Sequence, residues 1–170
     1  MSDLARSFPP ITAPDARLLI LGSMPGVASL EAQQYYAHPR NAFWPIAAGL
    51  FGVDVAAGYA ERCERLRAAK VAVWDVLRSC RREGSLDSAI DRASEVPNDF
   101  ASFFAEHRKI KRVVFNGQKS ESAFRRHVVP ILESRLIDRL TLTRAPSTSP
   151  AHAARTFDEK LHAWRAAMGF

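Results

Sequence analysis

The sequence has 170 residues, enough for one domain with a full hydrophobic core and too few for two ordinary domains. Hydrophobic residues make up 47% and charged residues 25%, which excludes the disordered and fibrous classes. Lys and Arg total 24 against 18 Asp and Glu, and this formal charge of +6 favours a polyanionic partner. On charge alone, a basic protein without such a partner is an equal alternative.

The two cysteines, Cys63 and Cys80, have no CxxC or Cys/His ligand spacing, so neither structural zinc nor a disulfide framework is expected. The N-terminus lacks a signal-peptide pattern, and no apolar run approaches the roughly 20 residues of a membrane span. We therefore expect a cytoplasmic monomer that has no metal or other cofactor and does not contact a membrane.

The chain begins with a proline-rich segment, residues 1–16, which we expect to be an extended lead-in to a single domain spanning 1–170. Residues 17–21 (RLLIL) predict a buried strand. Residues 22–45 (GSMPGVASLEAQQYYAHPRNAFWP) leave that strand through a glycine and proline turn and carry aromatic, His, Arg and Asn side chains. We interpret this stretch as a site.

Apolar residues between 43 and 51 have the spacing of one buried helical face, which places Asn41 just before a helix. A charged helix is predicted for 59–69. The apolar run 71–74 then predicts a second strand, which ends at Asp75.

Residues 79–96 (SCRREGSLDSAIDRASEV) are polar, and we expect a long connection with little regular structure. Its arginines could face phosphates, although a solvated loop is the commoner outcome. Asn98 is the predicted N-cap of the next helix, with Asp99 in its first turn and phenylalanines on its buried face.

The last third of the chain predicts two strands and two helices. In chain order, these elements span residues 112–115, 119–132, 138–143 and 157–168. Four short strands separated by helices imply a mainly parallel sheet covered on both faces, a three-layer α/β/α sandwich.

In open α/β sheets, ligands bind outside the carboxyl ends of the strands. Here the four strands are followed by residues 22–26, Asp75, residues 116–118 and residues 146–152. We therefore expect the polar groups of these segments to meet at one rim of the sheet.

The sequence contains no Walker motif, GxGxxG fingerprint, HExxH or GxSxG. ATP hydrolysis, dinucleotide redox chemistry and metalloprotease chemistry are therefore disfavoured. A hydrolase triad built on Ser23 has little support, because any chain of this length offers such combinations.

The residues at the predicted rim suit recognition of a planar group beside a phosphate backbone. Tyr35 and Tyr36 can stack on a base, while Asn41, Asp75 and Asn116 can read base edges. Taken singly, each has an ordinary structural explanation, such as a core aromatic or a turn.

The loop at 144–152 (RAPSTSPAH) adds an arginine, hydroxyl groups and backbone amides for phosphates. Planar recognition combined with phosphate binding suggests base flipping.

Five motifs resemble the hypoxanthine-DNA glycosylase (DNA-deoxyinosine glycosylase) branch of the uracil-DNA glycosylase superfamily. They are LGSMPG at 21–26, QQYYAHPRNAFWP at 33–45, VWDVL at 73–77, FNGQKS at 115–120 and PSTSPAH at 146–152. The resemblance extends from about Phe8 to the C-terminus. It implies an α/β/α sandwich that flips a deaminated base out of DNA and hydrolyses its glycosidic bond.

The resemblance also implies roles for single residues. Met24 lies where the superfamily often has a water-positioning Asn or Asp, and Asn41 of the PRN element is associated with that task instead. Tyr36 matches the aromatic that stacks on the flipped base, and Asp75 matches a polar pocket position. PSTSPAH matches the loop that grips DNA, although it lacks the large apolar wedge of some relatives.

The expected base-binding residues are Gly22, Ser23, Met24, Tyr36, His38, Asp75 and Asn116. The expected DNA-binding residues are Arg40, Lys119, Arg144, Ser147, Thr148, Ser149 and His152.

No lysine lies in the opening motif, so a Schiff-base route with strand cleavage lacks a nucleophile there, and a monofunctional hydrolytic enzyme is expected. Three alternatives stay open. The same fold could act on uracil; the protein could bind DNA without catalysis, which Met24 makes worth considering; or it could be a phosphoester hydrolase, for which the sequence offers no metal constellation.

Overall fold

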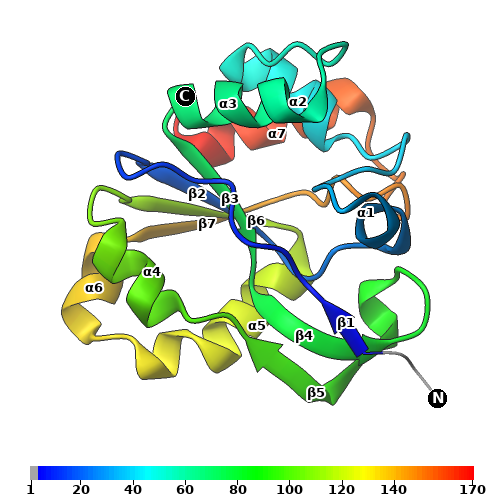
Figure 1. Cartoon of the computed structure of the whole chain (residues 1–170). Helices are drawn as coiled ribbons and strands as arrows, with labels where there is room; N and C mark the ends of the chain where they lie inside the picture. Colours follow the sequence, from blue (N-terminus) through cyan, green and yellow to red (C-terminus); the bar gives the residue numbers. More distant parts are fainter. Residues whose placement is uncertain (1–3) are drawn as a thin grey trace.

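The computed structural model describes residues 4–170, which form two sheets surrounded by helices (Figure 1). The central sheet has the strand order β3-β2-β6-β7, and each of its neighbouring pairs is parallel. Its strands are β2 (Leu18–Gly22), β3 (Val71–Asp75), β6 (Arg112–Asn116) and β7 (Thr141–Ala145). This four-stranded parallel sheet confirms the predicted α/β class.

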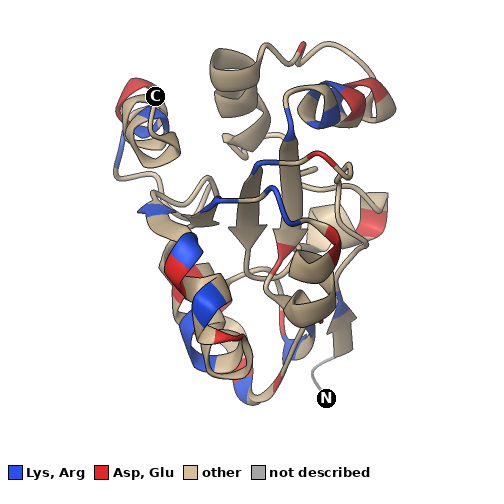
Figure 2. Cartoon of the chain, turned by 90° about the vertical axis from the view of Figure 1, so that its left-hand side faces the viewer, with Lys and Arg blue, Asp and Glu red and all other residues tan. Residues whose placement is uncertain are grey.

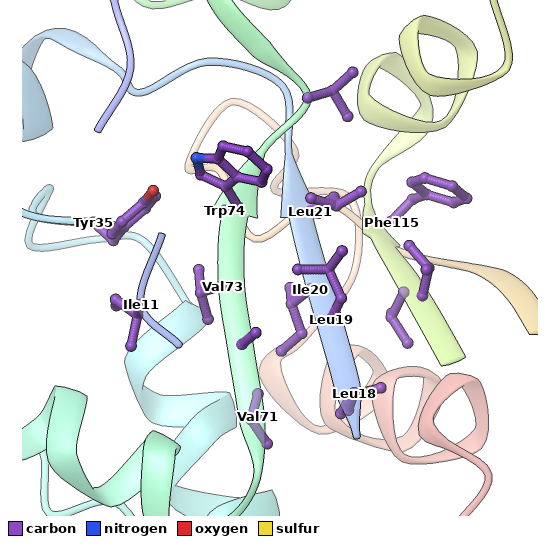
Figure 3. Packing of buried hydrophobic residues seen from close by; sticks show 14 of the residues in the cluster. Ile11, Leu18, Leu19, Ile20, Leu21, Tyr35, Val71, Val73, Trp74 and Phe115 are labelled. Carbon is purple, nitrogen blue, oxygen red and sulfur yellow. The ribbon is translucent and has the colours of Figure 1, made fainter. Parts of the chain in front are cut away.

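The central strands are apolar because both of their faces are covered. All five residues of β2 and all five of β3 are buried, as is typical of parallel strands inside a layered domain. Figure 3 shows their side chains, among them Leu19 and Val73, packed on the sheet beside Phe115 of β6. The edge strand β7 is only partly buried, and its apolar pattern is accordingly weaker.

Helices cover both faces of the central sheet (Figure 1). The helices α2, α3 and α7 lie on one side, and α4, α5 and α6 lie on the other, so the predicted three-layer arrangement is confirmed. The helices are α1 (Val27–Ala32), α2 (Phe43–Phe51), α3 (Tyr59–Ala68), α4 (Phe100–Glu106), α5 (Gln118–His127), α6 (Ser134–Arg139) and α7 (Phe157–Met168), with 3-10 turns at Asp87–Ala89 and Val129–Ile131.

The second sheet was not predicted. It is antiparallel, with the order β1 (Leu4–Arg6), β4 (Leu77–Arg82) and β5 (Ile90–Pro97). The expectation of an irregular connection at 79–96 is therefore wrong, because that segment forms most of a hairpin. The strands were not recognised because the segment is rich in charged residues. Two of these residues, Arg82 and Glu95, are nevertheless buried, and each bonds to other groups of the protein.

Three boundaries also differ from the sequence prediction. The helix predicted for 119–132 is α5, which ends at His127 and is followed by the 3-10 turn at Val129–Ile131. The fourth central strand begins at Thr141 and not at 138, because 134–139 form α6. The N-cap of α4 is Asp99, whose carboxylate accepts a hydrogen bond from the Ser102 amide at 3.1 Å. Asn98 is instead buried and donates from its amide nitrogen to the Asp75 carbonyl at 2.8 Å.

The charge of the protein is spread over its surface. On the face seen in Figure 2, Lys and Arg are interspersed with Asp and Glu along the helices. No helix among residues 4–170 is long and apolar enough to cross a membrane. In the same part of the chain, both cysteines are buried free thiols.

Candidate active site

A cavity of about 600 Å³ opens at the carboxyl ends of β2, β3 and β6. Two of the segments that line it, α1 and the loop that leads from β7 to α7, lie on the right-hand side of Figure 1. The volume is in the usual range for a small-molecule site. The expectation that the strand exits meet at one rim is thus confirmed. The predicted site residues that line the cavity are Gly22, Ser23, Met24, Tyr36, His38, Asn41, Asp75, Asn116, Lys119, Ser147, Thr148, Ser149 and His152.

Asn41 is fixed by the turn that precedes α2. Its backbone amide donates to the His38 carbonyl at 2.9 Å, and its side-chain Oδ1 accepts from the Phe43 amide at 2.9 Å. A carboxamide oxygen can accept two hydrogen bonds, so Oδ1 keeps one acceptor position. Asn41 therefore presents an oriented acceptor at the cavity, where a water molecule can bind.

The two adjacent tyrosines have different environments. Tyr36 has a left-handed backbone conformation, with φ of 55°, and its ring stacks on Phe43 with 4.1 Å between ring centroids. Tyr35 is only 3% exposed, and its hydroxyl donates to the Pro9 carbonyl at 2.9 Å. The expectation that Tyr35 stacks on a base is therefore wrong; Tyr35 is a core residue, and Tyr36 is the one available for stacking.

Asn116 holds the last loop against the pocket. Its Oδ1 accepts from the Thr148 amide at 2.9 Å, while its Nδ2 donates to the Thr148 hydroxyl at 2.9 Å and to the Tyr36 hydroxyl at 3.2 Å. Both amide hydrogens thus have partners within the protein. This geometry favours a positioning role for Asn116 over reading a base edge.

Thr148 is equally occupied. It is 1% exposed, and its carbonyl accepts from the Ala42 amide at 3.0 Å. The hydroxyl of Thr148 is therefore directed into the protein and not toward a phosphate. Through Thr148, the loop after β7 is joined directly to the turn that carries Asn41.

Asp75 is a buried acid with unused hydrogen-bonding capacity. Within residues 4–170, its Oδ2 has no hydrogen-bond partner. Burial and, to a smaller extent, the nearby carboxylate of Asp87 raise the pKa of Asp75 to about 7, although the Arg82 guanidinium acts in the opposite direction. A methyl group on Gly22 would lie 2.5 Å from Oδ1 of Asp75, so only glycine leaves room for this carboxyl. When neutral, the carboxyl can both donate and accept.

The hairpin tip between β4 and β5 forms a wall of the cavity that the sequence prediction missed. Ser85, Leu86, Asp87 and Ser88 all line it. The hydroxyl of Ser23 donates to Oδ1 of Asp87 at 2.6 Å, which ties the opening turn to this tip. The turn-forming residues Gly84 and Ser85 between the two polar segments were the available sign of a hairpin.

Lys119 is held in an ion cluster. Its ammonium pairs with the buried Glu95, which also accepts from Arg126 at 3.2 Å and from His127 at 2.7 Å. Burial alone would raise the pKa of Glu95, but the hydrogen bonds from Lys119 and His127 outweigh burial and hold the pKa below its usual value. The cluster joins β5 to α5, and it holds the Lys119 ammonium against a carboxylate that Lys119 shares with Arg126.

Two of the predicted DNA contacts lie outside the cavity lining. Arg40 is exposed, and its backbone amide donates to Nδ1 of His38 at 3.1 Å. Arg144 is also exposed and lies 3.7 Å from the carboxylate of Glu121. Both remain on the surface, where a DNA backbone could reach them.

Comparison with known proteins places this geometry in a family. The model of the uracil DNA glycosylase superfamily matches residues 9–168. A protein from Methanosarcina barkeri named hypoxanthine DNA glycosylase is 38% identical over 116 residues, which cover 68% of this chain and 72% of that protein. A protein of the same name from Methanosarcina acetivorans is 34% identical over 118 residues, which cover 69% and 73%.

A solved structure has the same fold along nearly the whole chain. It is the solution NMR structure of a candidate uracil DNA glycosylase from Methanosarcina acetivorans, 28% identical, with a TM-score of 0.77. The superposition covers 98% of this chain and 99% of that one. The chain therefore belongs to the uracil DNA glycosylase superfamily and is a DNA glycosylase.

Proposed function

We propose that this DNA glycosylase removes hypoxanthine from deoxyinosine in DNA by hydrolysis and leaves the strand uncut. The observation that carries the proposal is the cavity, which unites an oriented amide on Asn41, an aromatic ring on Tyr36 and the carboxyl of Asp75, whose Oδ2 has no partner among residues 4–170. The names of the two Methanosarcina relatives support hypoxanthine as the base. A monomeric state and a cytoplasmic location stay predictions.

In the proposed reaction, the glycosidic bond breaks toward an oxocarbenium-like sugar whose charge the DNA phosphates help to stabilise. The free acceptor position of Asn41 Oδ1 orients a water toward C1′. The water oxygen forms the new bond to C1′, and its proton passes to solvent. An amide is a weak base, but orientation suffices when the base departs before the water attacks.

The departing purine takes the electrons of the broken bond and needs a proton or hydrogen bonds. Neutral Asp75 is one donor at the cavity, and the Tyr36 hydroxyl is another, because burial raises its pKa and keeps it protonated. In neutral His38, Nδ1 accepts from Arg40, which leaves the proton on Nε2 as a third donor. We assign Asp75 this role because its oxygen lacks a partner among the described residues.

A panel of duplexes tests the proposed function against its alternatives. Duplexes carrying hypoxanthine, uracil, xanthine or mismatched thymine are incubated with the protein and treated with alkali, which cuts at abasic sites. Hypoxanthine should give the fastest product. A faster product from uracil would favour a uracil-specific enzyme, and salt-dependent binding with no abasic product would indicate a binding-only relative.

Replacing Tyr36 by Ala is expected to lower the single-turnover excision rate about tenfold to a hundredfold, because base stacking on an aromatic ring contributes about 1 to 3 kcal/mol. Tyr36→Phe is the matched control, since it keeps the ring on Phe43 and loses only the hydroxyl bonded to Asn116. The rates are measured with enzyme in excess over a hypoxanthine duplex. An unchanged rate for Tyr36→Ala would rule out the stacking role.

A further inference from the structure

An exposed leucine projects from the rim of the cavity. Of the exposed large apolar side chains among residues 4–170, Leu86 and Val27 are the two that line it. Leu86 is 54% exposed and is flanked by the polar residues Ser85 and Asp87. It is the longer of the two apolar side chains and lies at the tip of the β4–β5 hairpin.

The residues on both sides of Leu86 are anchored through their side chains, one to the start of α1 and the other to the opening turn. On one side, the Ser85 hydroxyl accepts from the Val27 amide at 2.8 Å. On the other side, the Asp87 carboxylate accepts from the Ser23 hydroxyl at 2.6 Å. The tip is thus fixed one residue before and one residue after the leucine, so Leu86 is presented from a defined position.

The end of β4, just before the hairpin tip, is also fixed by hydrogen bonds. The buried guanidinium of Arg82 donates to the Gly84 carbonyl at 2.8 Å and also to the Pro25 carbonyl. The Glu95 cluster joins the second strand of the hairpin to α5. These contacts connect the hairpin that carries Leu86 to two parts of the cavity wall, the opening turn at Pro25 and α5 at Lys119.

Base flipping leaves a gap in the DNA stack, and proteins that unstack DNA frequently insert an apolar side chain at the step they open. The loop at 146–152 contacts the cavity but contains only small, polar, proline and histidine residues. The required apolar side chain is therefore available from the hairpin and not from that loop.

We propose that Leu86 enters the base stack and fills the gap left by the flipped nucleotide. The DNA would then be contacted by the hairpin tip and by the loop at 146–152, which both line the cavity. The inference rests on the proposed function only in requiring a flipped nucleotide, and it does not depend on which base is removed.

The test compares Leu86→Ala with the parent protein on two substrates, one with the damaged base paired in a duplex and one with it in a single strand. Leu86→Ala should lower the single-turnover rate on the duplex about tenfold or more, because unstacking a duplex step is costly. On the single strand, where no gap forms, its rate should stay within about twofold of the parent. Leu86→Met should retain most of the duplex activity.

Leu4→Ala is the matched control, since Leu4 is 50% exposed, lies in the same small sheet and does not line the cavity. A duplex rate for Leu86→Ala equal to that of the control would overturn the proposal. An equal loss on both substrates would also overturn it, because it would place Leu86 inside the base pocket. A stronger and duplex-specific loss in His152→Ala, with Leu86→Ala unaffected, would assign the wedge to the other loop.

Fluorescence of 2-aminopurine, placed in DNA at the position to be flipped, separates this inference from the proposed function. Binding of the parent should raise the fluorescence as the base leaves the stack, whether or not any base is excised. Leu86→Ala should bind the same DNA with a smaller rise. An equal rise in both proteins would contradict the wedge even if the parent proved inactive on every damaged base.

Discussion

Replacing Asn41 by Ala is expected to lower the single-turnover rate of hypoxanthine excision about a hundredfold or more, while DNA affinity stays nearly unchanged. Loss of a correctly oriented reacting group can alone cost about a hundredfold in rate. In this protein, Asn41 Oδ1 is aligned by the Phe43 amide, and Met24 offers no replacement acceptor at the opening turn. Excision by Asn41→Ala at the parent rate would contradict this role.

A second variant separates catalysis from folding. Asn41→Ala also removes the acceptor for the Phe43 amide at the start of α2, which typically costs about 1 kcal/mol. Asn41→Ser can still accept from that amide, but its shorter hydroxyl reaches less far into the cavity. Both variants should lose excision to a similar extent, while Asn41→Ser should melt closer to the parent. Recovery of activity in Asn41→Ser would attribute the loss to the helix start.

Three strands of the central sheet, β2, β3 and β6, could be predicted from the sequence because they contain apolar runs, whereas the edge strand β7 lacks one and was placed with the wrong bounds. Because β2 and β3 are buried on both faces, their residues are apolar apart from Gly22 and Asp75 at the strand ends. The small sheet could not be predicted in the same way. Its hairpin buries Arg82 and Glu95, whose charges are compensated by partners distant in sequence, so the pattern of apolar residues does not reveal which positions face inward.

The members of the site could be predicted, but their hydrogen-bond partners could not. The rule that ligands bind at the carboxyl ends of strands brought Asp75 and Asn116 to the same rim. Composition could not show that the Asn116 amide has all its hydrogen-bond partners in Thr148 and Tyr36, whereas Oδ2 of Asp75 has none within residues 4–170. Tyr35 and Tyr36 are adjacent residues of the same type, and the sequence does not show that Tyr35 is 3% exposed with its hydroxyl bonded to Pro9, while Tyr36 has a left-handed backbone.

The excision rate is expected to fall as the pH rises above about 7, because Asp75 then loses the proton that it donates to the leaving base. Its pKa is raised to about 7, so Asp75 is neutral below that pH and charged above it. Above the pKa, the neutral fraction declines about tenfold for each pH unit. Asp75→Asn keeps a hydrogen-bond donor at every pH, so its profile should be flat through this range. A parent profile with no change near pH 7 would contradict the assignment.

Asp87, whose carboxylate raises the pKa of Asp75, provides a control for this pH dependence. Asp87→Asn removes the neighbouring negative charge, which should lower the pKa of Asp75 and move the fall in rate to lower pH. The hydroxyl of Ser23 keeps an acceptor in this variant, since the introduced amide oxygen can take the place of the carboxylate oxygen. A profile that stays at its original pH would mean that burial alone sets the pKa of Asp75.

The same titration has a consequence for folding that does not depend on activity. The pKa of Asp75 is 3.8 in the absence of the fold and about 7 within it, so between these values the folded state binds a proton that the unfolded state has lost. The free energy of unfolding should therefore decline as the pH rises from about 4 to about 7, and the contribution of Asp75 should level off above that.

Asp75→Asn should lose this decline and be more stable than the parent at pH 8. Denaturant unfolding of both proteins between pH 4 and 8 measures the difference, and parallel curves would show that the buried carboxyl does not titrate as the structure requires.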